Sequence, residues 1–421
     1  MALPTSERRT GPELSRRSKN LPASPIRRIF ALASQIEESG EEVFRLDIGD
    51  PDFILPSRIR DGIVRALAEG ETRYSAMAGI SALRSALAAH MNRKMGLGIG
   101  PQQIVVHQGA TQALNAAILM TCGPSRTLLL PEIYWPNYLQ QAILGSVRTR
   151  FYPLTQEFLP DIGRLRRHFT PGMRALLVNS PANPTGAVHL PRVVRAIYAF
   201  AREHNLWILS DEAYVDFVFE GETLSPLQID SEFPEQERRV VGLYSFSKSF
   251  AATGLRMGWS VWPSVEAGQL AGRMNEPLTG SLTTPLQWGM VEALREDDSG
   301  QRREALRPRR DLVSAVFRKR GLKISPPAGG LFYFVDVRPT GLSGEEFADQ
   351  LLREERVAVV PGRGFGLVPT TGEKGGLQFE ASSMAERCVR LCFAVPEELL
   401  REGVSRFASF FLRRQVSDKR E

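Results

Sequence analysis

The sequence predicts an α/β protein, with a large domain built on a mostly parallel sheet flanked by helices and a smaller α+β domain. Short apolar runs alternate with helical segments between residues 104 and 243. This alternation is typical of parallel strands that are connected by helices and buried on both faces. From about residue 290 the pattern changes to charged helices and separate strands. A chain of 421 residues is long enough for two or three structural units.

The N-terminal part begins with a polar, arginine-rich segment over residues 1–20, which predicts a loose arm. We expect residues 1–55 to form this arm and part of the small domain. Several further segments before the first buried strand show helical or extended periodicity. They are predicted helices at 25–36, 58–68 and 80–95, the last closed by Gly96, and a predicted strand at 44–48.

Residues 56–290 are expected to form the large domain and residues 291–421 the small C-terminal domain. The large domain is predicted from short apolar strands with helices between them. Its strands are 104–107, 127–130, 175–178, 206–209 and 240–243, and its clearest helices are 112–120 and 192–203. The small domain has predicted helices at 291–319 and 344–355, strands at 331–335, 357–360 and 389–393, and a terminal helix after Pro396.

Composition narrows the possible partners and the compartment. The net charge of +6 raises nucleic acid as a partner, but the arginines are dispersed and accompany no zinc-finger or RNA-binding signature. Anionic small molecules are the better expectation. Without an apolar run near 18 residues we expect no membrane partner, and no secretory signal is visible. Three cysteines predict ordinary core packing, no metal site and a reducing, cytoplasmic location.

Polar clusters follow four of the predicted strands. In open α/β sheets, ligands bind beyond the carboxyl ends of the strands, so these clusters should meet at one site. The clusters are Gly109-Ala110-Thr111, residues 179–186, residues 210–214 and residues 245–248. The first begins a helix, where free backbone N–H groups favour a bound phosphate.

Lys248 is the only lysine between Lys94 and Lys319, and arginine supplies every other positive charge in that interval. Arginine stays protonated, whereas lysine can lose its proton and act as a nucleophile. Lys248 is therefore predicted to form an imine with an aldehyde.

Taken together, the motifs resemble the class I/II aminotransferases of fold type I, which depend on pyridoxal 5′-phosphate (PLP). The resemblance covers residues from about 15 to 412 and lies in short segments in matching order and spacing. The segments are 48–53, 73–74, 180–186, 210–214, 245–250, 254–259, 359–362 and 389–391. The family resemblance implies an enzyme that moves the amino group of an L-amino acid to a 2-oxo acid by a ping-pong mechanism.

The resemblance implies a role for each catalytic side chain. Lys248 would bear the cofactor imine and then carry a proton between the substrate Cα and the cofactor. Asp211 would keep the cofactor ring nitrogen protonated, and Tyr214 and Asn183 would bind the ring's 3′-oxygen. Trp135 would stack on the ring and line the substrate site.

It also implies how phosphate and substrate are held. The phosphate ligands would be Ala110, Thr111, Ser245, Ser247 and Arg256. Arg390 would grip the substrate α-carboxylate, helped by Gly49 and Asn183. Tyr74 would reach the phosphate of the neighbouring subunit, which implies a homodimer with shared active sites.

This chain departs from dicarboxylate-specific members of the family at two places. Thr111 and Thr279 stand where such members carry a cation for the distal carboxylate. Arg363 and Arg28 are possible substitutes. We therefore expect a neutral or hydrophobic amino acid on one side of the reaction and glutamate with 2-oxoglutarate on the other.

Three alternative functions are weighed against this prediction, and only the first stays open. A PLP-dependent β-lyase shares the fold and cofactor. A PLP-sensing transcription regulator would need a winged-helix domain, and only about 40 residues precede the match at Gly49-Asp50-Pro51. A dinucleotide-binding module would need a Gly-x-Gly-x-x-Gly after its first strand, which is lacking.

Overall fold

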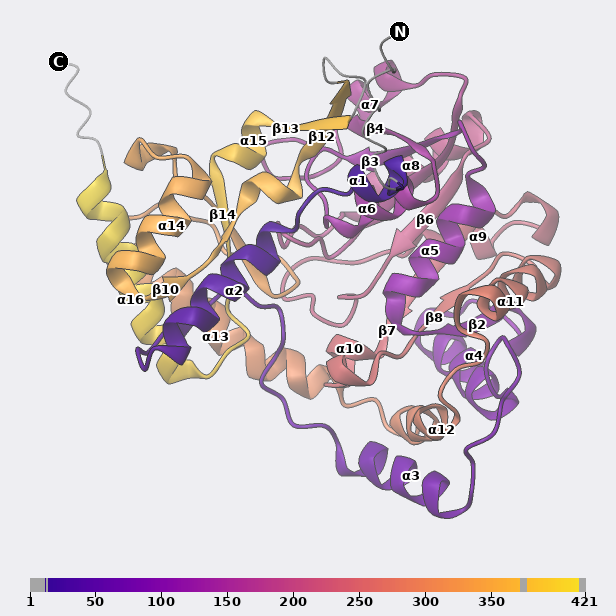
Figure 1. Ribbon diagram of the computed structural model, residues 1–421. Helices are drawn as coiled ribbons and strands as arrows, with labels where there is room; N and C mark the ends of the chain where they lie inside the picture. The colour runs from indigo at the N-terminus through magenta and orange to yellow at the C-terminus, as the bar shows by residue number, and fades with distance from the viewer. Residues whose placement is uncertain (1–11, 13, 372–376, 416–421) are drawn as a thin grey trace, which may run out of the picture.

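A seven-stranded sheet forms the centre of the larger unit in the computed structural model, which describes residues 12, 14–371 and 377–415 (Figure 1). The strand order is β2-β8-β7-β6-β5-β3-β4, and β8 runs antiparallel to both of its neighbours while the other pairings are parallel. The strands are β2 (Ile104–His107), β3 (Thr127–Pro131), β4 (Arg148–Tyr152), β5 (Met173–Asn179), β6 (Trp207–Asp211), β7 (Val240–Ser245) and β8 (Gly258–Val261).

Helices cover both faces of this sheet, so its strands are buried on both sides. Along β2, Val105 belongs to one hydrophobic core while Ile104 and Val106 belong to another. The period of two in a strand produces this division. The helices of this unit are α3 (Ser57–Ala68), α4 (Ser81–Met95), α5 (Gly109–Thr121), α6 (Asn137–Leu144), α7 (Ile162–His168), α8 (Pro191–Glu203), α9 (Pro226–Ser231), α10 (Phe246–Ser249), α11 (Val265–Thr279) and α12 (Thr284–Ala293).

The smaller unit contains the antiparallel sheet β11-β14-β9, the parallel pair β1-β10 and the hairpin β12-β13. Its strands are β1 (Phe44–Arg45), β9 (Phe332–Asp336), β10 (Val357–Ala358), β11 (Val360–Pro361), β12 (Leu367–Thr371), β13 (Leu377–Ala381) and β14 (Cys388–Cys392). The remaining helices are α1 (Arg16–Lys19), α2 (Pro25–Glu38), α13 (Ser299–Lys319), α14 (Gly344–Glu355), α15 (Ser383–Glu386) and α16 (Glu397–Arg414). Short 3₁₀ turns occur at η1 (Pro101–Gln103), η2 (Glu235–Glu237), η3 (Thr253–Leu255), η4 (Arg338–Thr340) and η5 (Gly362–Phe365).

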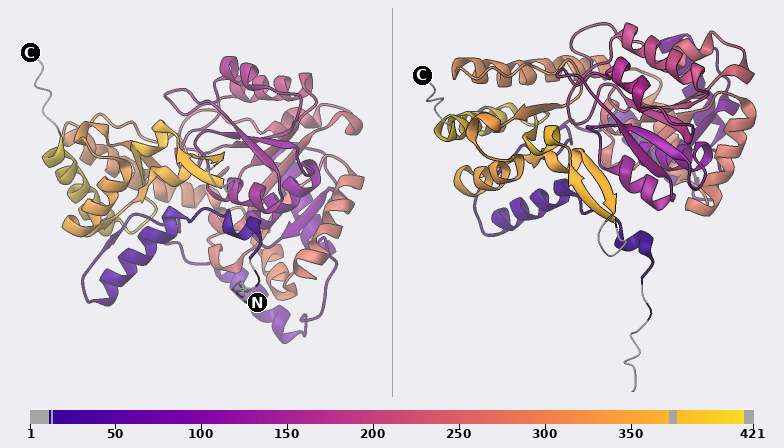
Figure 2. Two further views of the ribbon diagram at one scale, coloured as in Figure 1. Left: turned by 45° about the horizontal axis from the view of Figure 1, so that its top comes forward. Right: turned by 90° about the horizontal axis from the view of Figure 1, so that it is seen from above.

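The start of the chain completes the C-terminal unit. Phe44 in β1 pairs with Val357 in β10. On α2, Ile29 and Ala33 are fully buried in the same core as Phe347 of α14. Figure 1 shows α2 beside the C-terminal elements, and Figure 2 shows the smaller unit against one side of the larger one from two further directions. The boundaries at residues 55 and 290 remain a prediction.

The α/β class with a mostly parallel sheet is confirmed, and β2 and α14 have the predicted bounds. The single helix predicted over 291–319 is wrong, because α12 ends at Ala293 and α13 begins at Ser299. Asp297 accepts hydrogen bonds from the backbone N–H and hydroxyl of Ser299, which favours a turn over a continuous helix.

The prediction of a loose arm needs a partial correction. Most of residues 1–13 lie outside the described part of the chain, but Arg16–Lys19 forms the short helix α1, and Arg17 donates a hydrogen bond to Ser146 at 2.9 Å. The sequence patterns also missed the edge strand β4 and the antiparallel strand β8. In the part of the chain that the structure describes, none of the helices combines the length and apolarity needed to cross a membrane.

Candidate active site

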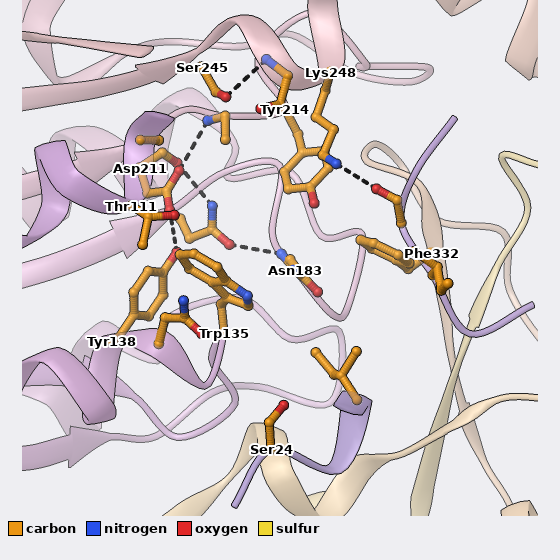
Figure 3. A pocket seen from close by; sticks show the side chains of 18 of the residues that line it. Ser24, Thr111, Trp135, Tyr138, Asn183, Asp211, Tyr214, Ser245, Lys248 and Phe332 are labelled. Atoms are coloured by element: carbon orange, nitrogen blue, oxygen red, sulfur yellow. Dashed lines mark hydrogen bonds between the residues drawn. The ribbon is translucent and has the colours of Figure 1, made fainter. Parts of the chain in front are cut away.

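A pocket of about 380 Å³ opens where the carboxyl ends of the parallel strands meet the smaller unit. The larger unit supplies most of its wall, and β9, β14 and the start of α2 supply the rest (Figure 3). The structure brings twelve of the thirteen predicted site residues together here. They are Gly49, Ala110, Thr111, Trp135, Asn183, Asp211, Tyr214, Ser245, Ser247, Lys248, Arg256 and Arg390.

One end of the pocket is built to hold an anion. Helix α5 begins at Gly109, whose φ of +74° is a conformation that favours glycine. Ala110 and Thr111 follow in the first turn, where backbone N–H groups have no partner within the helix. A Cβ atom at Gly109 would lie 2.8 Å from Nη2 of Arg256, so a side chain there would displace that guanidinium.

The second half of this anion site comes from the loop after β7. The Ser245 hydroxyl accepts a hydrogen bond from the Ser247 backbone N–H at 3.1 Å and caps α10. Arg256 has a φ of +53°, and its Nη1 donates to the carbonyl of Thr253 at 2.8 Å. These bonds hold two hydroxyls and one guanidinium at the same end of the pocket.

Asp211 lies at the end of β6 and is 5% exposed. Its Oδ2 accepts from the Tyr138 hydroxyl at 2.6 Å, and its Oδ1 accepts from the Ala213 backbone N–H at 3.1 Å. Burial raises the pKa of Asp211, and the two hydrogen bonds oppose that rise. Among the described residues Asp211 forms no ion pair. Its buried carboxyl can therefore accept a hydrogen bond from a cationic N–H group of a ligand.

Lys248 projects into the pocket from α10. Its Nζ donates to the Gly49 carbonyl at 2.5 Å (Figure 3). Loss of hydration lowers the pKa of Lys248 to about 8, and the positive charges of Arg256 and Arg390 act in the same direction, against the opposing charge of Asp50. At neutral pH a useful fraction of this amine is therefore unprotonated.

Arg390 on β14 is 3% exposed and is held from three sides. Its Nη1 donates to Oδ1 of Asn183 at 3.0 Å, and its Nη2 donates to the carbonyl of Asp47 at 2.7 Å. The guanidinium carbon lies 4.2 Å from the centre of the Phe332 ring. Among the described residues Nε has no hydrogen-bond partner. A buried guanidinium with a free donor fits a carboxylate ligand.

Two aromatic side chains complete the middle of the pocket. Trp135 meets Tyr138 edge-to-face, with ring centres 5.6 Å apart. Tyr214 is buried, and its burial raises its pKa, so its hydroxyl stays protonated and can donate a hydrogen bond. Figure 3 shows Trp135 and Tyr214 on different sides of the space between Asp211 and Asn183.

Sequence reasoning gave no role to two residues that organise the site. Tyr138 holds Asp211 from the first turn of α6, and nothing in its local sequence indicated this partner. Asn179 donates to the carbonyl of Asp211 at 3.0 Å, and its Oδ1 accepts from the backbone N–H of Asn183 at 2.8 Å. Asn179 thereby ties the ends of β5 and β6 together.

Neither suggested substitute for a distal cation lies in the pocket. Arg28 forms two hydrogen bonds with Asp349, at 2.8 and 3.2 Å, and Arg363 pairs with Glu386. Both suggestions are therefore wrong, because ion pairs outside the pocket occupy these side chains. Tyr74, the thirteenth predicted residue, is 93% exposed and does not line this chain's pocket.

Comparison with known proteins agrees with this geometry. The model of the family "Aminotransferase class I and II" matches residues 41–407. The chain is 35% identical over 402 residues to the aspartate/prephenate aminotransferase of Thermus thermophilus, covering 94% of this chain and 98% of that protein. It is also 35% identical to the arginine–pyruvate transaminase of Pseudomonas aeruginosa, covering 86% and 92%.

Among solved structures, the aspartate aminotransferase from Thermus thermophilus with maleate superposes with a TM-score of 0.85 at 33% identity, covering 95% of this chain and 100% of that one. The named relatives are aminotransferases, so the β-lyase alternative is not favoured. The chain therefore belongs to the class I and II aminotransferases and is a PLP-dependent aminotransferase of fold type I.

Proposed function

We propose that Lys248, Asp211 and Arg390 carry the reaction in the roles predicted from the sequence. The observation that carries this proposal is their convergence on one pocket beside an anion site. When bound, PLP supplies an aldehyde carbon and a ring that accepts electrons. Arg390 lines the pocket and binds the substrate α-carboxylate through its guanidinium. The unprotonated amine of Lys248 removes the proton from the substrate Cα and returns one during turnover.

The residues present fit the cofactor. Asp211 is a buried carboxyl that accepts hydrogen bonds from two neutral donors, the Tyr138 hydroxyl and the Ala213 backbone N–H, which leaves it suited to a protonated ring nitrogen. Asn183 and Tyr214 provide donors for the ring's 3′-oxygen, and Trp135 provides a flat apolar surface. The N–H groups of α5, two serine hydroxyls and Arg256 provide the phosphate site.

The role of Lys248 is tested with a second lysine as control. Borohydride reduction of the holoenzyme should attach the cofactor to the peptide that contains Lys248. Lys248→Ala should retain PLP through the phosphate site but lose nearly all turnover. Lys94→Ala is the matched control, because Lys94 is also half-buried but pairs with Asp216 outside the pocket. Attachment of the cofactor to any lysine other than Lys248 would refute the assignment.

We also propose a homodimer in which Tyr74 completes the neighbouring chain's phosphate site. Two observations support it. Tyr74 is 93% exposed in the single chain, away from its own pocket. Large apolar side chains are also exposed on α3, on α11 and in the segment just before α3, as expected of a covered surface. They are Ile54, Val64, Leu67, Leu270 and Leu278.

Hybrid dimers test the shared site. A Lys248→Ala chain paired with a Tyr74→Ala chain would contain one intact and one doubly altered site if Tyr74 acts across the interface. Such hybrids should recover about half of the wild-type turnover per dimer. If Tyr74 instead binds the phosphate of its own chain, each site of the hybrid carries one substitution. The turnover of the hybrid then equals the mean turnover of the two mutant homodimers. A Tyr74→Ala homodimer that retains PLP like wild type would remove the residue from the phosphate site.

For the substrates, we propose a neutral or hydrophobic amino acid on one side and glutamate with 2-oxoglutarate on the other. Thr111 provides no charge at its place in the wall, and Ile26, Phe30 and Phe332 add apolar surface.

We further propose a cytoplasmic location, which is supported by three cysteines that are all buried free thiols.

A further inference from the structure

Four cationic side chains line the pocket among the residues that the structure describes. Lys248, Arg256 and Arg390 each have a place in the proposed reaction. Arg27 is the fourth, and nothing in the proposed reaction uses it. Arg27 is exposed to solvent, so its guanidinium stays hydrated and remains available to an anion that enters the pocket.

Arg27 enters the pocket from the first turn of α2. Ser24, Ile26 and Phe30 line the same wall, and the Ser24 hydroxyl makes no capping bond to the helix. Figure 3 shows Ser24 across the pocket from Lys248, with Trp135 and Asn183 between them. The wall formed by Ser24, Ile26, Arg27 and Phe30 therefore faces the part of a substrate that points away from the reacting carbon.

The neighbouring Arg28 differs from Arg27, because carboxylates pair with its guanidinium. Arg28 is engaged by Asp349 and lies within 3.4 Å of Glu345. Arg27 forms no hydrogen bond or ion pair with the described residues. Its backbone is nevertheless fixed, because Ile29 and Ala33 of the same helix are fully buried in the core of the smaller unit. The packed helix α2 therefore fixes the backbone of Arg27, while the guanidinium of Arg27 is free to bind a ligand.

We infer that Arg27 binds the distal carboxylate of an acidic substrate, while Arg390 binds its α-carboxylate. This inference rests on the proposed function and names the substrate class for one of its two half-reactions: dicarboxylic amino acids and their 2-oxo acids. A neutral side chain can occupy the same space against Ile26 and Phe30. The exposed arginine then turns to solvent without breaking an ion pair.

The test compares Arg27→Gln with Arg28→Gln, a matched change one residue away and outside the pocket. Single-turnover conversion of the cofactor is measured with glutamate and with glutamine, which have nearly the same shape but differ in distal charge. Loss of a charge-assisted hydrogen bond should lower kcat/KM for glutamate roughly 10- to 100-fold in Arg27→Gln. For glutamine and leucine the change should stay within about 3-fold, and Arg28→Gln should leave the ratio unchanged.

A binding measurement separates recognition from chemistry. Succinate carries two carboxylates and no amino group, and butyrate is its monocarboxylate counterpart. Arg27→Gln should raise the dissociation constant for succinate roughly 10-fold or more, with little change for butyrate. The succinate effect should also shrink as salt concentration rises.

Several results would overturn the inference. An equal decrease in kcat/KM for glutamate and glutamine, or the same decrease in Arg28→Gln, would show that Arg27 does not bind the distal carboxylate. A wild-type enzyme that converts neutral amino acids but neither glutamate nor aspartate would refute both this inference and the proposed glutamate half-reaction, while the proposed roles of Lys248, Asp211 and Arg390 would stand. If no amino acid converts the cofactor, the proposed function itself fails.

Discussion

The hydrogen bond from Tyr138 to Asp211 gives the sharpest test of how this site works. Tyr138 is 1% exposed and its hydroxyl donates to Asp211 Oδ2 at 2.6 Å. Tyr138→Phe keeps the ring that packs against Trp135 and removes the side-chain donor to the carboxyl, which leaves the backbone N–H of Ala213 as the other donor. Removing a donor to the ionised form raises the pKa of Asp211, which burial has already raised.

The expected change in the ionisation of Asp211 follows from the energy of a hydrogen bond to a charged group. A hydrogen bond to a charged group stabilises it by about 1.5–3 kcal/mol. This corresponds to a factor of roughly 10 to 100 in the balance between ionised and protonated carboxyl. An Asp211 that binds a proton no longer keeps the cofactor ring nitrogen protonated, so activity should fall first at low pH. The acidic limb of kcat/KM should therefore move to higher pH in Tyr138→Phe.

Tyr152→Phe is the matched control. Tyr152 is also 1% exposed, and its hydroxyl donates to the Leu177 carbonyl at 3.0 Å, away from Asp211. Both variants lose one buried hydrogen bond, so both should lower the free energy of unfolding by about 0.5–1.5 kcal/mol or somewhat more. The assay is the pH profile of kcat/KM from pH 5 to pH 9, with thermal unfolding measured in parallel. An acidic limb that stays in place in Tyr138→Phe, or moves equally in Tyr152→Phe, would refute the reasoning.

Three further predictions concern other parts of the pocket. Because the pKa of Lys248 is lowered from 10.5 to about 8, its unprotonated fraction at pH 7 rises from about 0.03% to about 9%. The rate at which cofactor-free protein captures PLP should therefore increase with pH up to about 8 and then level off. A stopped-flow rate that is independent of pH would contradict this. Arg390→Lys loses the forked contact with a carboxylate, so KM should rise roughly 10-fold or more for acidic and neutral substrates alike, as steady-state kinetics can show. Gly109→Ala forces a side chain into a φ of +74° and to 2.8 Å from Arg256 Nη2, so PLP affinity by equilibrium dialysis should fall, whereas Gly123→Ala, with open space around it, should not change it.

Local patterns predicted elements of both units. The strand at 104–107 is a run of apolar residues between turn signals, and the helix at 344–355 has a serine cap followed by glutamate in its first turn. These signals act over a few residues, so they can be read before the fold is known. The same holds for Lys248, whose isolation among arginines indicated chemistry rather than charge.

Elements that depend on distant partners could not be predicted in this way. Strand β8 is extended because it fills the gap between β2 and β7, pairing Trp259 with Val106 and Tyr244. Nothing within Gly258–Val261 specifies those partners or the antiparallel direction. The break between α12 and α13 likewise depends on Asp297, whose carboxyl accepts hydrogen bonds from the backbone N–H and hydroxyl of Ser299.

For the active site, the sequence by itself determined which groups could perform the chemistry, since imine formation, carboxylate binding and phosphate binding each need particular side chains. Only the tertiary structure decided which groups are available. Arg27 and Arg28 are identical neighbours in the sequence, yet one lines the pocket and the other pairs with Asp349. Adjacent residues on a helix point about 100° apart, so the packing of α2 determines which of the two arginines the substrate can meet.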